Sequence, residues 1–362
     1  MSKVQRYYDI SRILKKDANI NLIYGEKSNG KSYKAKHVLA VEHYLETNKR
    51  FILMRRWQAD ITSLWIEQYF KDVDVKKLTN GKYEFITCYR KILYFGNYNE
   101  KKGTVSKDEK IGYVIALSTE QHMSSASFLD VDTIIFEEFF ERGCYIKNEP
   151  AKLMIFYNTI DRKRGTTKLY CIGNTITKVI PYLKDWGLMK VIKNLKQGEI
   201  TEIVYHNEEN DVKIAIEYCE SSGGKTMAIG SAKSMIDKGS WQTNPQPHLP
   251  KSKNDYHILF RIGFLYQGFK FLGEFLQDKE DFKKQIWFIF PYENGEFKDD
   301  LIIFSDEIST SPYYQKDIYK LTFKNDRIQN LLYNTFRESM IAYSDDLTGT
   351  DFKNAIDFMI RK

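Results

Sequence analysis

The segment Gly25-Glu26-Lys27-Ser28-Asn29-Gly30-Lys31-Ser32 constrains this chain most, because it fits G-x-x-x-x-G-K-[ST], the pattern of a phosphate-binding loop. The glycines let the backbone turn so that successive N–H groups point at phosphate oxygens. Lys31 is expected to reach the β- and γ-phosphates of ATP, and the Ser32 hydroxyl to coordinate Mg²⁺. All eight residues are therefore predicted to bind the nucleotide.

The flanking residues support this interpretation of the loop. Residues 21–24 are apolar and predict a strand, and residues 32–45 predict a helix. A helix that begins at the loop adds partial positive charge beneath the phosphates. The order strand, loop, helix is the order that phosphate binding requires.

A second motif lies at residues 132–139 (DTIIFEEF), where an apolar strand ends in two carboxylates. This pattern is typical of a Walker B motif. Glu137, where Asp is usual, is expected to hold Mg²⁺ directly or through water, opposite Ser32. Glu138 is expected to orient and activate the attacking water. The alternative is a pair of surface acids beside a strand.

Further patterns predict an α/β domain with a mostly parallel sheet. Residues 50–55 form an apolar run typical of a strand buried on both faces, and it ends in Arg55 and Arg56. Ligand-facing residues are common at such strand ends, so one of these arginines is expected to touch nucleotide or a neighbouring subunit, or else to cap the strand at the surface. The other expected elements are helices at 5–17, 59–70 and 150–160, a hairpin at 82–95 that turns at Arg90-Lys91, strands at 114–117 and 168–175, and a mobile, lysine-rich loop at 97–110.

Two polar positions in this half are further candidates. The basic cluster at residues 161–165 is either a solvated turn or the source of an arginine that enters a neighbouring subunit's nucleotide site. Asn174 ends the strand at 168–175, where it would contact the γ-phosphate, or it is a plain turn residue. Both readings remain open from the residues alone.

Charge suggests a polyanionic partner. Residues 1–200 carry 35 Lys and Arg against 23 Asp and Glu, whereas residues 201–362 carry 20 against 25. Excess positive charge in the nucleotide-binding half favours nucleic acid, although solvated lysines would give the same count. The charged N-terminus does not resemble a signal peptide, and no apolar run is long enough to span a bilayer. The four cysteines are widely spaced and are expected to be reduced.

The length of 362 residues predicts more than one domain. We expect an ATPase domain over 1–200, a hairpin, helix and linker segment over 201–250, and an α+β domain over 251–362. The proline-containing residues 240–253 are the best boundary. The hairpin is expected at 199–219 and the helix at 228–237. The last domain is expected to hold strands over 256–310 and helices at 326–343 and 350–360.

Together these motifs resemble the genome-packaging ATPases (encapsidation proteins) of small tailed phages with protein-primed linear DNA genomes. The resemblance depends on the early phosphate loop, FILMRR, DTIIFEEF, and NTIDRKR followed by LYCIGNT and VIPYL, and it covers residues 5–190 well. It implies an ASCE-type P-loop motor that forms a homomeric ring, a pentamer, on the portal of a prohead in the host cytoplasm. The ring would drive double-stranded DNA inward with ATP, and in some members a structural packaging RNA links it to the capsid.

The resemblance also implies roles for single residues. Lys31 and Ser32 correspond to Walker A, Glu137 and Glu138 to Walker B, and Arg162 to the trans-acting arginine finger, with Arg164 as the alternative. Asn174 falls in the motif that couples hydrolysis to movement. The family can carry a lysine before Walker B, where this chain has Ser124.

The C-terminal domain of the family resembles an RNase H-like nuclease without cleavage activity. Two-metal cleavage needs clustered carboxylates, the first usually inside the opening strand, and LFRIGFLY has none. The remaining acid pairs are Asp299-Asp300, Asp306-Glu307 and Asp345-Asp346. Two other functions stay open: a large-terminase enzyme with both ATPase and nuclease activity, and a non-hydrolytic, nucleotide-gated DNA-binding scaffold.

Overall fold

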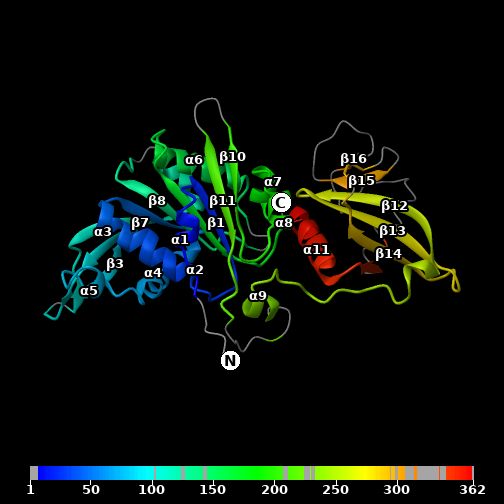
Figure 1. Cartoon of the computed structure of the whole chain (residues 1–362), viewed down its shortest axis with the longest axis horizontal. Coiled ribbons are helices and arrows are strands. Elements are labelled where there is room, and N and C mark those ends of the chain that lie inside the picture. Colours follow the sequence, from blue (N-terminus) through cyan, green and yellow to red (C-terminus); the bar gives the residue numbers. More distant parts are fainter. Residues whose placement is uncertain are drawn as a thin grey trace.

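The computed structural model of the chain contains two main sheets (Figure 1). It describes residues 7–101, 103–123, 127–141, 145–206, 211–223, 229, 233–293, 295–297, 301–305, 314–315, 334 and 340–360. Within this part of the chain, Cys88, Cys171 and Cys219 are free thiols.

The larger sheet has nine strands in the order β10-β11-β1-β9-β8-β2-β7-β4-β3. Its interior, from β11 to β7, is parallel, and β10, β4 and β3 are antiparallel additions at the edges. The predicted mostly parallel sheet is therefore confirmed. The strands are β1 (Ile20–Gly25), β2 (Arg50–Arg55), β3 (Phe85–Tyr89), β4 (Ile92–Gly96), β7 (Glu109–Ala116), β8 (Val131–Glu137), β9 (Lys168–Asn174), β10 (Ile200–Tyr205) and β11 (Val212–Tyr218).

One strand, β9, separates the phosphate-loop strand β1 from the Walker B strand β8. This is the arrangement expected of an ASCE-type fold. It places the carboxyl ends of β1, β9, β8 and β2 in a row, so residues that follow these strands meet at one edge of the sheet.

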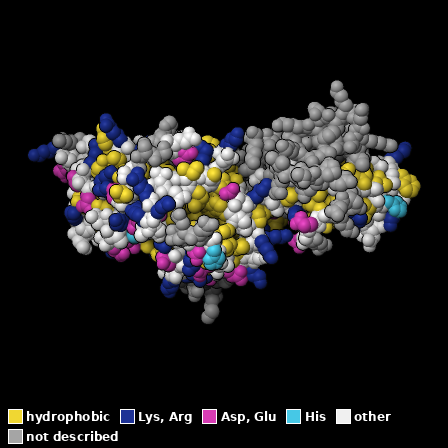
Figure 2. All heavy atoms as spheres, turned by 90° about the horizontal axis from the view of Figure 1, so that it is seen from above, with side chains coloured by type: hydrophobic (Ala, Val, Ile, Leu, Met, Phe, Trp, Pro, Cys, Tyr) yellow, Lys and Arg dark blue, Asp and Glu magenta, His cyan; other side chains and the backbone are white. Residues whose placement is uncertain are grey.

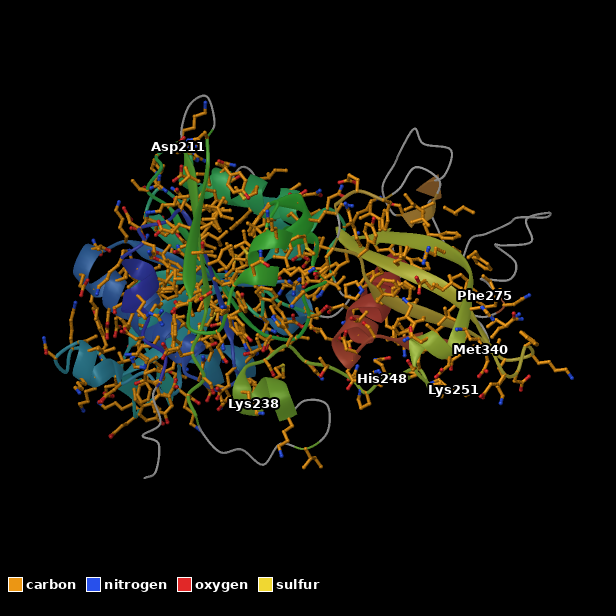
Figure 3. All side chains as sticks on the ribbon, turned by 45° about the vertical axis from the view of Figure 1, so that its right-hand side comes forward. Asp211, Lys238, His248, Lys251, Phe275 and Met340 are labelled. Atoms are coloured by element: carbon orange, nitrogen blue, oxygen red, sulfur yellow. The ribbon has the colours of Figure 1, made fainter. Side chains whose placement is uncertain are left out.

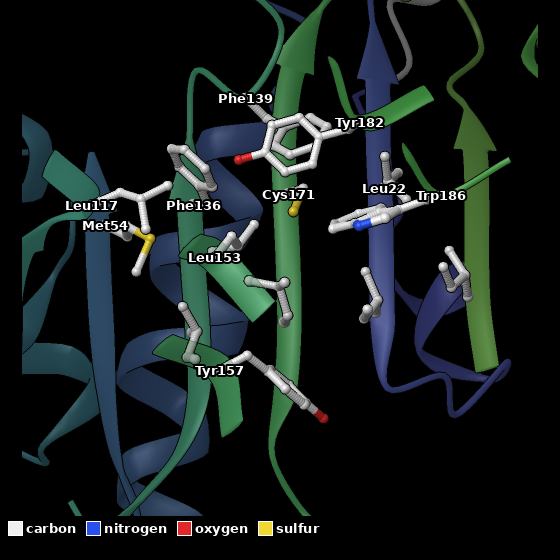
Figure 4. Packing of buried hydrophobic residues seen from close by; sticks show 14 of the residues in the cluster. Leu22, Met54, Leu117, Phe136, Phe139, Leu153, Tyr157, Cys171, Tyr182 and Trp186 are labelled. Carbon is white, nitrogen blue, oxygen red and sulfur yellow. The ribbon is translucent and has the colours of Figure 1, made fainter. Parts of the chain in front are cut away.

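Helices cover both faces of this sheet, and each face has its own apolar core. One face carries α1 (Ser11–Leu14), α2 (Lys31–Lys34), a π-helix (Ala35–Glu42), α3 (His43–Thr47), α4 (Ser63–Phe70) and α5 (Val75–Leu78). A 3₁₀ turn (Gln58–Asp60) lies between β2 and α4 in the chain. The other carries α6 (Glu149–Asp161), α7 (Pro181–Asp185) and α8 (Met189–Asn194). Figure 4 shows the second core, where Phe139 and Tyr182 face each other with ring centroids 4.4 Å apart.

Several predicted elements are confirmed and others are corrected. The strand at 50–55 and the hairpin that turns at Arg90-Lys91 are as expected. The helix predicted at 32–45 is continuous from Lys31 to Thr47, with a π-helical middle. The loop predicted at 97–110 contains a small hairpin, β5 (Tyr98–Asn99) with β6 (Thr104–Val105), and the start of β7. Of the helix predicted at 5–17, the described part forms only α1.

The hairpin expected at 199–219 is hydrogen-bonded into the nine-stranded sheet, because β11 pairs in parallel with β1. A division that follows the hydrogen bonding therefore falls after β11. The segment beyond it contains α9 (Lys233–Lys238), which overlaps the predicted helix 228–237, and a 3₁₀ turn (Lys253–Asp255).

The smaller sheet has the strand order β16-β15-β12-β13-β14-β17. Its strands are β12 (Tyr256–Tyr266), β13 (Phe269–Asp278), β14 (Gln285–Pro291), β15 (Ile302–Ser305), β16 (Tyr314–Gln315) and β17 (Ile341–Tyr343). The antiparallel run β12-β13-β14 is extended by β15, which is parallel to β12, and this agrees with an RNase H-like sheet.

Helix α11 (Asp346–Ile360) packs on this sheet through Phe352, Ala355 and Ile356. In Figure 3, His248 and Lys251 label the segment that leads into β12, and Phe275 labels β13 of this sheet. The first predicted tail helix, at 326–343, lies largely outside the described residues, and its end is strand β17. The second, at 350–360, is part of α11.

Candidate active site

The phosphate loop, residues 25–32, follows β1 at the carboxyl edge of the large sheet. Gly30 has φ +97° and Ser28 has φ 65°, so both residues have left-handed backbone. Glycine adopts this conformation without strain, which explains why the loop has a glycine at position 30. Helix α2 begins directly after Gly30. The loop therefore has the strand-loop-helix setting that the sequence predicted.

Lys31 is buried and turns back over its own loop. Its Nζ donates to the carbonyl oxygen of Glu26, to Oδ1 of Asn29 at 3.0 Å and to Oδ1 of Asn174 at 3.3 Å. Burial lowers the pKa of Lys31 from its ordinary value. These oxygens solvate the ammonium group at the point where phosphate oxygens would take their place.

Ser32 and Glu137 come together as predicted. Ser32 Oγ donates to Glu137 Oε2 at 2.9 Å, and Tyr69 on α4 donates to Oε1 at 2.8 Å. Glu137 is 5% exposed, and burial raises its pKa while the two hydrogen bonds oppose the rise. A hydroxyl beside a carboxylate is the oxygen donor set that Mg²⁺ takes together with phosphate oxygens and water, so these residues fit the ion.

Tyr69 was missed by the sequence reasoning. It lies in the helix predicted at 59–70, and nothing in that amphipathic pattern indicates contact with a residue 68 positions away. Burial raises the pKa of Tyr69 far above its usual range, so the phenol keeps its proton and remains a donor to Glu137.

Glu138 follows β8 with its side chain 55% exposed. Its backbone has φ 57°, a left-handed conformation that is uncommon for a residue other than glycine. Arg55, at the end of the neighbouring strand β2, donates from Nη2 to Glu138 Oε2 at 2.9 Å. Arg55 thus contacts the predicted catalytic carboxylate of its own chain.

Arg56 binds the backbone of the same turn. It is 3% exposed, and it donates to the carbonyl oxygens of Glu138 at 3.1 Å and Phe139 at 2.8 Å. Its Nε pairs with both oxygens of the fully buried Glu149, which also accepts from Tyr182. This neutralised, fully bonded pair holds the backbone that presents Glu138.

Asn174 ends β9 beside Lys31, where the sequence placed a γ-phosphate contact. The preceding residue, Gly173, has no room for a side chain, because a Cβ there would lie 2.6 Å from Phe140 Cδ2. The end of β9 therefore packs closely against Phe140, and this packing fixes the position of Asn174 at the end of the strand.

Glu26 was predicted to bind nucleotide, but its side chain is occupied inside the protein. It is 2% exposed and accepts hydrogen bonds from Ser221 Oγ, Ser222 N and Ser222 Oγ at 2.5, 2.9 and 2.6 Å. Only the backbone of Glu26 is therefore available to phosphate. Its carboxylate joins the phosphate loop to the segment that leads out of the large sheet.

The basic cluster lies at the opposite edge of the sheet. Residues 162–167 precede β9, whereas the phosphate loop follows the parallel strand β1. Arg164 donates to four carbonyl oxygens of its own chain, those of Leu129, Val131, Ile160 and Asp161. Arg162 is exposed and ends α6 with φ 49°. Neither arginine reaches the nucleotide site of its own chain.

The acid pairs considered for nuclease chemistry are only partly described. Asp299-Asp300 and Asp306-Glu307 lie outside the described residues, as does Ser124. Asp345 accepts from Thr348 N and Oγ1, and Asp346 accepts from Gln246 N, so this pair is bound at the start of α11. Among the described residues there is no group of three or more His, Cys, Asp or Glu that could hold a metal ion.

A hollow of about 770 Å³ is lined by most of the candidate residues, but Gly25, Glu26 and Arg162 do not line it. Lys31, Ser32, Glu137, Glu138 and Asn174 all line it. A volume of this size is within the usual range for small-molecule sites.

Among the described residues, the helices include none with the length and apolar character that a membrane span requires.

Comparison with known proteins gives a consistent result. The family model described as podovirus DNA encapsidation protein (Gp16) matches residues 1–209. The chain is 22% identical over 362 residues to the DNA packaging protein of Bacillus phage phi29, covering 92% of this chain and 98% of that protein. It is 26% identical over 192 residues to the DNA packaging protein of Bacillus phage PZA, covering 51% of each.

The fold is also similar to a solved structure, the bacteriophage Phi-29 viral genome packaging motor assembly. The match has a TM-score of 0.57 and 17% identity, and it covers 98% of this chain and 99% of the other. Both sheets of the chain are therefore included in the likeness.

Proposed function

Because this chain belongs to the podovirus DNA encapsidation proteins, a family that acts in DNA packaging, we propose that it hydrolyses ATP and uses the energy to move double-stranded DNA into a preformed prohead. Nucleotide binding and hydrolysis are assigned here to the hollow at the carboxyl edge of the large sheet. The proposal draws on the geometry of that site and on the family.

The observation that carries the proposal is the contact between Ser32 Oγ and Glu137 Oε2 at 2.9 Å, with Glu138 next in the chain. It joins the two motifs, 105 residues apart, into one site. A loop that only bound nucleotide would need no carboxylate positioned for water activation, so the pairing favours hydrolysis over the non-hydrolytic scaffold.

The residues have separate tasks in this scheme. Backbone N–H groups of residues 25–32 and Nζ of Lys31 bind the phosphates, and Lys31 exchanges its bonds to Asn29 and Asn174 for bonds to phosphate oxygens. Ser32 and Glu137 hold Mg²⁺, which when bound neutralises charge on the β- and γ-phosphates. Glu138 leaves Arg55, orients the attacking water and accepts its proton.

The site is completed by a second copy of the chain. Arg162 lies at the opposite edge of the sheet from the phosphate loop, so it reaches a nucleotide only across an interface between subunits. Arg162 is exposed, whereas Arg164 is half-buried and bound to carbonyl oxygens of its own chain, so Arg162 is the better candidate for this role. There its guanidinium stabilises charge on the transferring phosphoryl group.

The assembly that follows is a homomeric ring, a pentamer, docked at the portal vertex of a prohead in the host cytoplasm. A structural packaging RNA is a further partner implied by the resemblance. We assign the ATPase domain to the nine-stranded sheet and its helices, with the C-terminal sheet as the second domain. Figure 2 shows many Lys and Arg side chains on the described surface of the ATPase half, as suits contact with DNA phosphates.

Two assays on the full chain test this function. ATP hydrolysis is measured with and without linear duplex DNA, and plasmid nicking is measured with Mg²⁺ or Mn²⁺. We expect DNA-stimulated hydrolysis that Lys31→Ala abolishes, and no nicking. Metal-dependent nicking that is lost in Asp299→Ala, Asp306→Ala or Asp345→Ala would favour the terminase alternative, and ATP binding without hydrolysis under any condition would favour the scaffold.

A further inference from the structure

The turn between β3 and β4 has an unusual composition for its shape. Tyr89 pairs with Ile92, so Arg90 and Lys91 form a two-residue loop, with φ 49° and 63°. Two positive φ values are the signature of a type I′ hairpin turn, which favours Asn-Gly or Asp-Gly because most side chains are strained there. Two long cationic residues therefore occupy the turn at the expense of stability.

Positive charge is concentrated around this turn. The guanidinium of Arg90 lies 5.3 Å from the ring centroid of Tyr89, and Nζ of Lys107 lies 3.9 Å from the same centroid. Tyr89 is 45% exposed, and Arg90, Lys91 and Lys107 are exposed as well. One aromatic ring thus contacts two exposed cations.

The two acids that follow Lys107 in the chain bond to other residues. Among the described residues, no carboxylate pairs with Arg90, Lys91 or Lys107. Asp108 accepts from Ser106 Oγ at 2.6 Å. Glu109 accepts from Tyr44, Tyr83 and Lys82, and these bonds lower its pKa, so it remains ionised but committed to those partners.

The turn lies at the same edge of the large sheet as the nucleotide site. Strand β4 is antiparallel to β7, and Val114 N donates to the carbonyl oxygen of Lys91 at 2.9 Å near the carboxyl end of β7. Nζ of Lys91 donates at 2.5 Å to Gln58, which follows Arg55 and Arg56 in the chain. Figure 1 places β3 at the end of the molecule away from the C-terminal sheet.

We propose that the Arg90-Lys91 turn, with Tyr89 and Lys107, is a binding site for backbone phosphates of double-stranded DNA. The proposal rests on the proposed function and names the surface that DNA touches. Cations without carboxylate partners attract phosphates and release counterions from DNA, and they do so without reading sequence. Asn-Gly would make this turn more stable than Arg-Lys does. A strained turn that nevertheless carries two basic residues therefore indicates that these residues serve binding.

The test uses the full chain with Arg90→Asn and Lys91→Gly combined. This variant gives the turn its favoured sequence and removes two cations. We expect a higher Tm, weaker binding of a 30-base-pair duplex, and a slope of log K against log[salt] that is smaller by about 1.8, since each phosphate contact contributes ~0.9. Lys283→Gln with Lys284→Gln, which removes two exposed cations from the C-terminal domain, should leave the slope unchanged.

The outcomes separate this site from the wider function. If the wild-type chain binds duplex DNA and the turn variant binds it equally well with the same salt slope, the site is wrong and the packaging function stands. If the wild-type chain does not bind duplex DNA, the packaging function fails. If the variant loses affinity for a double-stranded RNA but keeps its affinity for DNA, the partner of the turn is RNA and the DNA site is rejected.

Discussion

Arg55 Nη2 donates a hydrogen bond to Glu138 Oε2 at 2.9 Å, so the carboxylate assigned to water activation is ion-paired with the neighbouring strand. Arg55 is itself held by Asp60 at 3.7 Å and by the ring of Trp65, whose centroid is 5.1 Å from the guanidinium. In the proposed mechanism Glu138 leaves this pair to orient the attacking water. The pair is therefore expected to restrain hydrolysis within a single chain.

Replacement of Arg55 by alanine should remove this restraint. We expect ATP turnover in the absence of DNA to rise, and the ratio of DNA-stimulated to basal turnover to fall. The rise should be about fivefold or less, because a half-exposed ion pair contributes at most ~1 kcal/mol. Steady-state ATPase assays measure it, with Arg55→Lys as a control that keeps the charge. A fall in basal turnover would show instead that Arg55 assists the reaction.

The two arginines of the basic cluster should give different defects. Arg164→Ala removes the guanidinium bonds to four carbonyl oxygens and should lower the Tm, whereas Arg162→Ala, at an exposed position, should leave the Tm close to that of the wild type. In assembled motors, Arg162→Ala should reduce turnover by about 10³-fold or more, as expected for a lost arginine finger.

Mixing experiments decide whether Arg162 acts across an interface. Lys31→Ala subunits keep Arg162, and Arg162→Ala subunits keep a complete phosphate loop. A mixture of the two inactive variants should regain part of the ATPase activity, measured as a function of their ratio. Mixtures that stay inactive at every ratio, while wild-type subunits still form active oligomers, would argue against a shared site.

We expect the stability of the chain to depend on pH through Asp351, which lies where the C-terminal domain contacts the ATPase domain. Burial raises the pKa of Asp351, on α11, from 3.8 to about 7, and Lys178 opposes the rise. Close by, Asn354 donates to Thr177 Oγ1 at 3.2 Å, and Thr177 lies three residues after Asn174. The native chain keeps a proton on Asp351 that the unfolded chain releases near pH 4.

The free energy of unfolding should therefore fall as pH rises from about 4 to 7, by up to ~1.4 kcal/mol per pH unit from this group. Its stabilising contribution is complete below pH 4 and is lost above pH 7. Tm measured between pH 4.5 and 7.5 should fall less steeply in Asp351→Asn than in the wild type. Asp185→Asn, at an exposed position, is the control, and equal slopes in all three proteins would contradict the assignment.

Local motifs were readable from the sequence because their chemistry is contained in a few adjacent residues. The phosphate loop needs two glycines, a lysine and a serine at fixed spacing, and the Walker B strand needs an apolar run before Glu137 and Glu138. The strand at 50–55 and the hairpin turn at Arg90-Lys91 were readable for the same reason.

The rest depends on contacts between distant residues. Tyr69 reaches Glu137, Arg55 reaches Glu138, and Glu26 reaches Ser221 and Ser222 only after the strands are ordered side by side. A single sequence carries no signal for such pairs. The pairing of β11 with β1 was missed in the same way, because its alternating residues predict a hairpin but not the strand beside which the hairpin lies.

The central claim is that hydrolysis at Glu138 drives DNA movement, and Glu138→Gln tests it most directly. The measurement is DNase-resistant DNA inside purified proheads, with ATP binding and hydrolysis followed in the same samples. The variant should bind ATP as the wild type does, hydrolyse it at least ~10²-fold more slowly, and package no DNA. A variant that hydrolyses ATP and packages DNA at the wild-type rate would contradict the account.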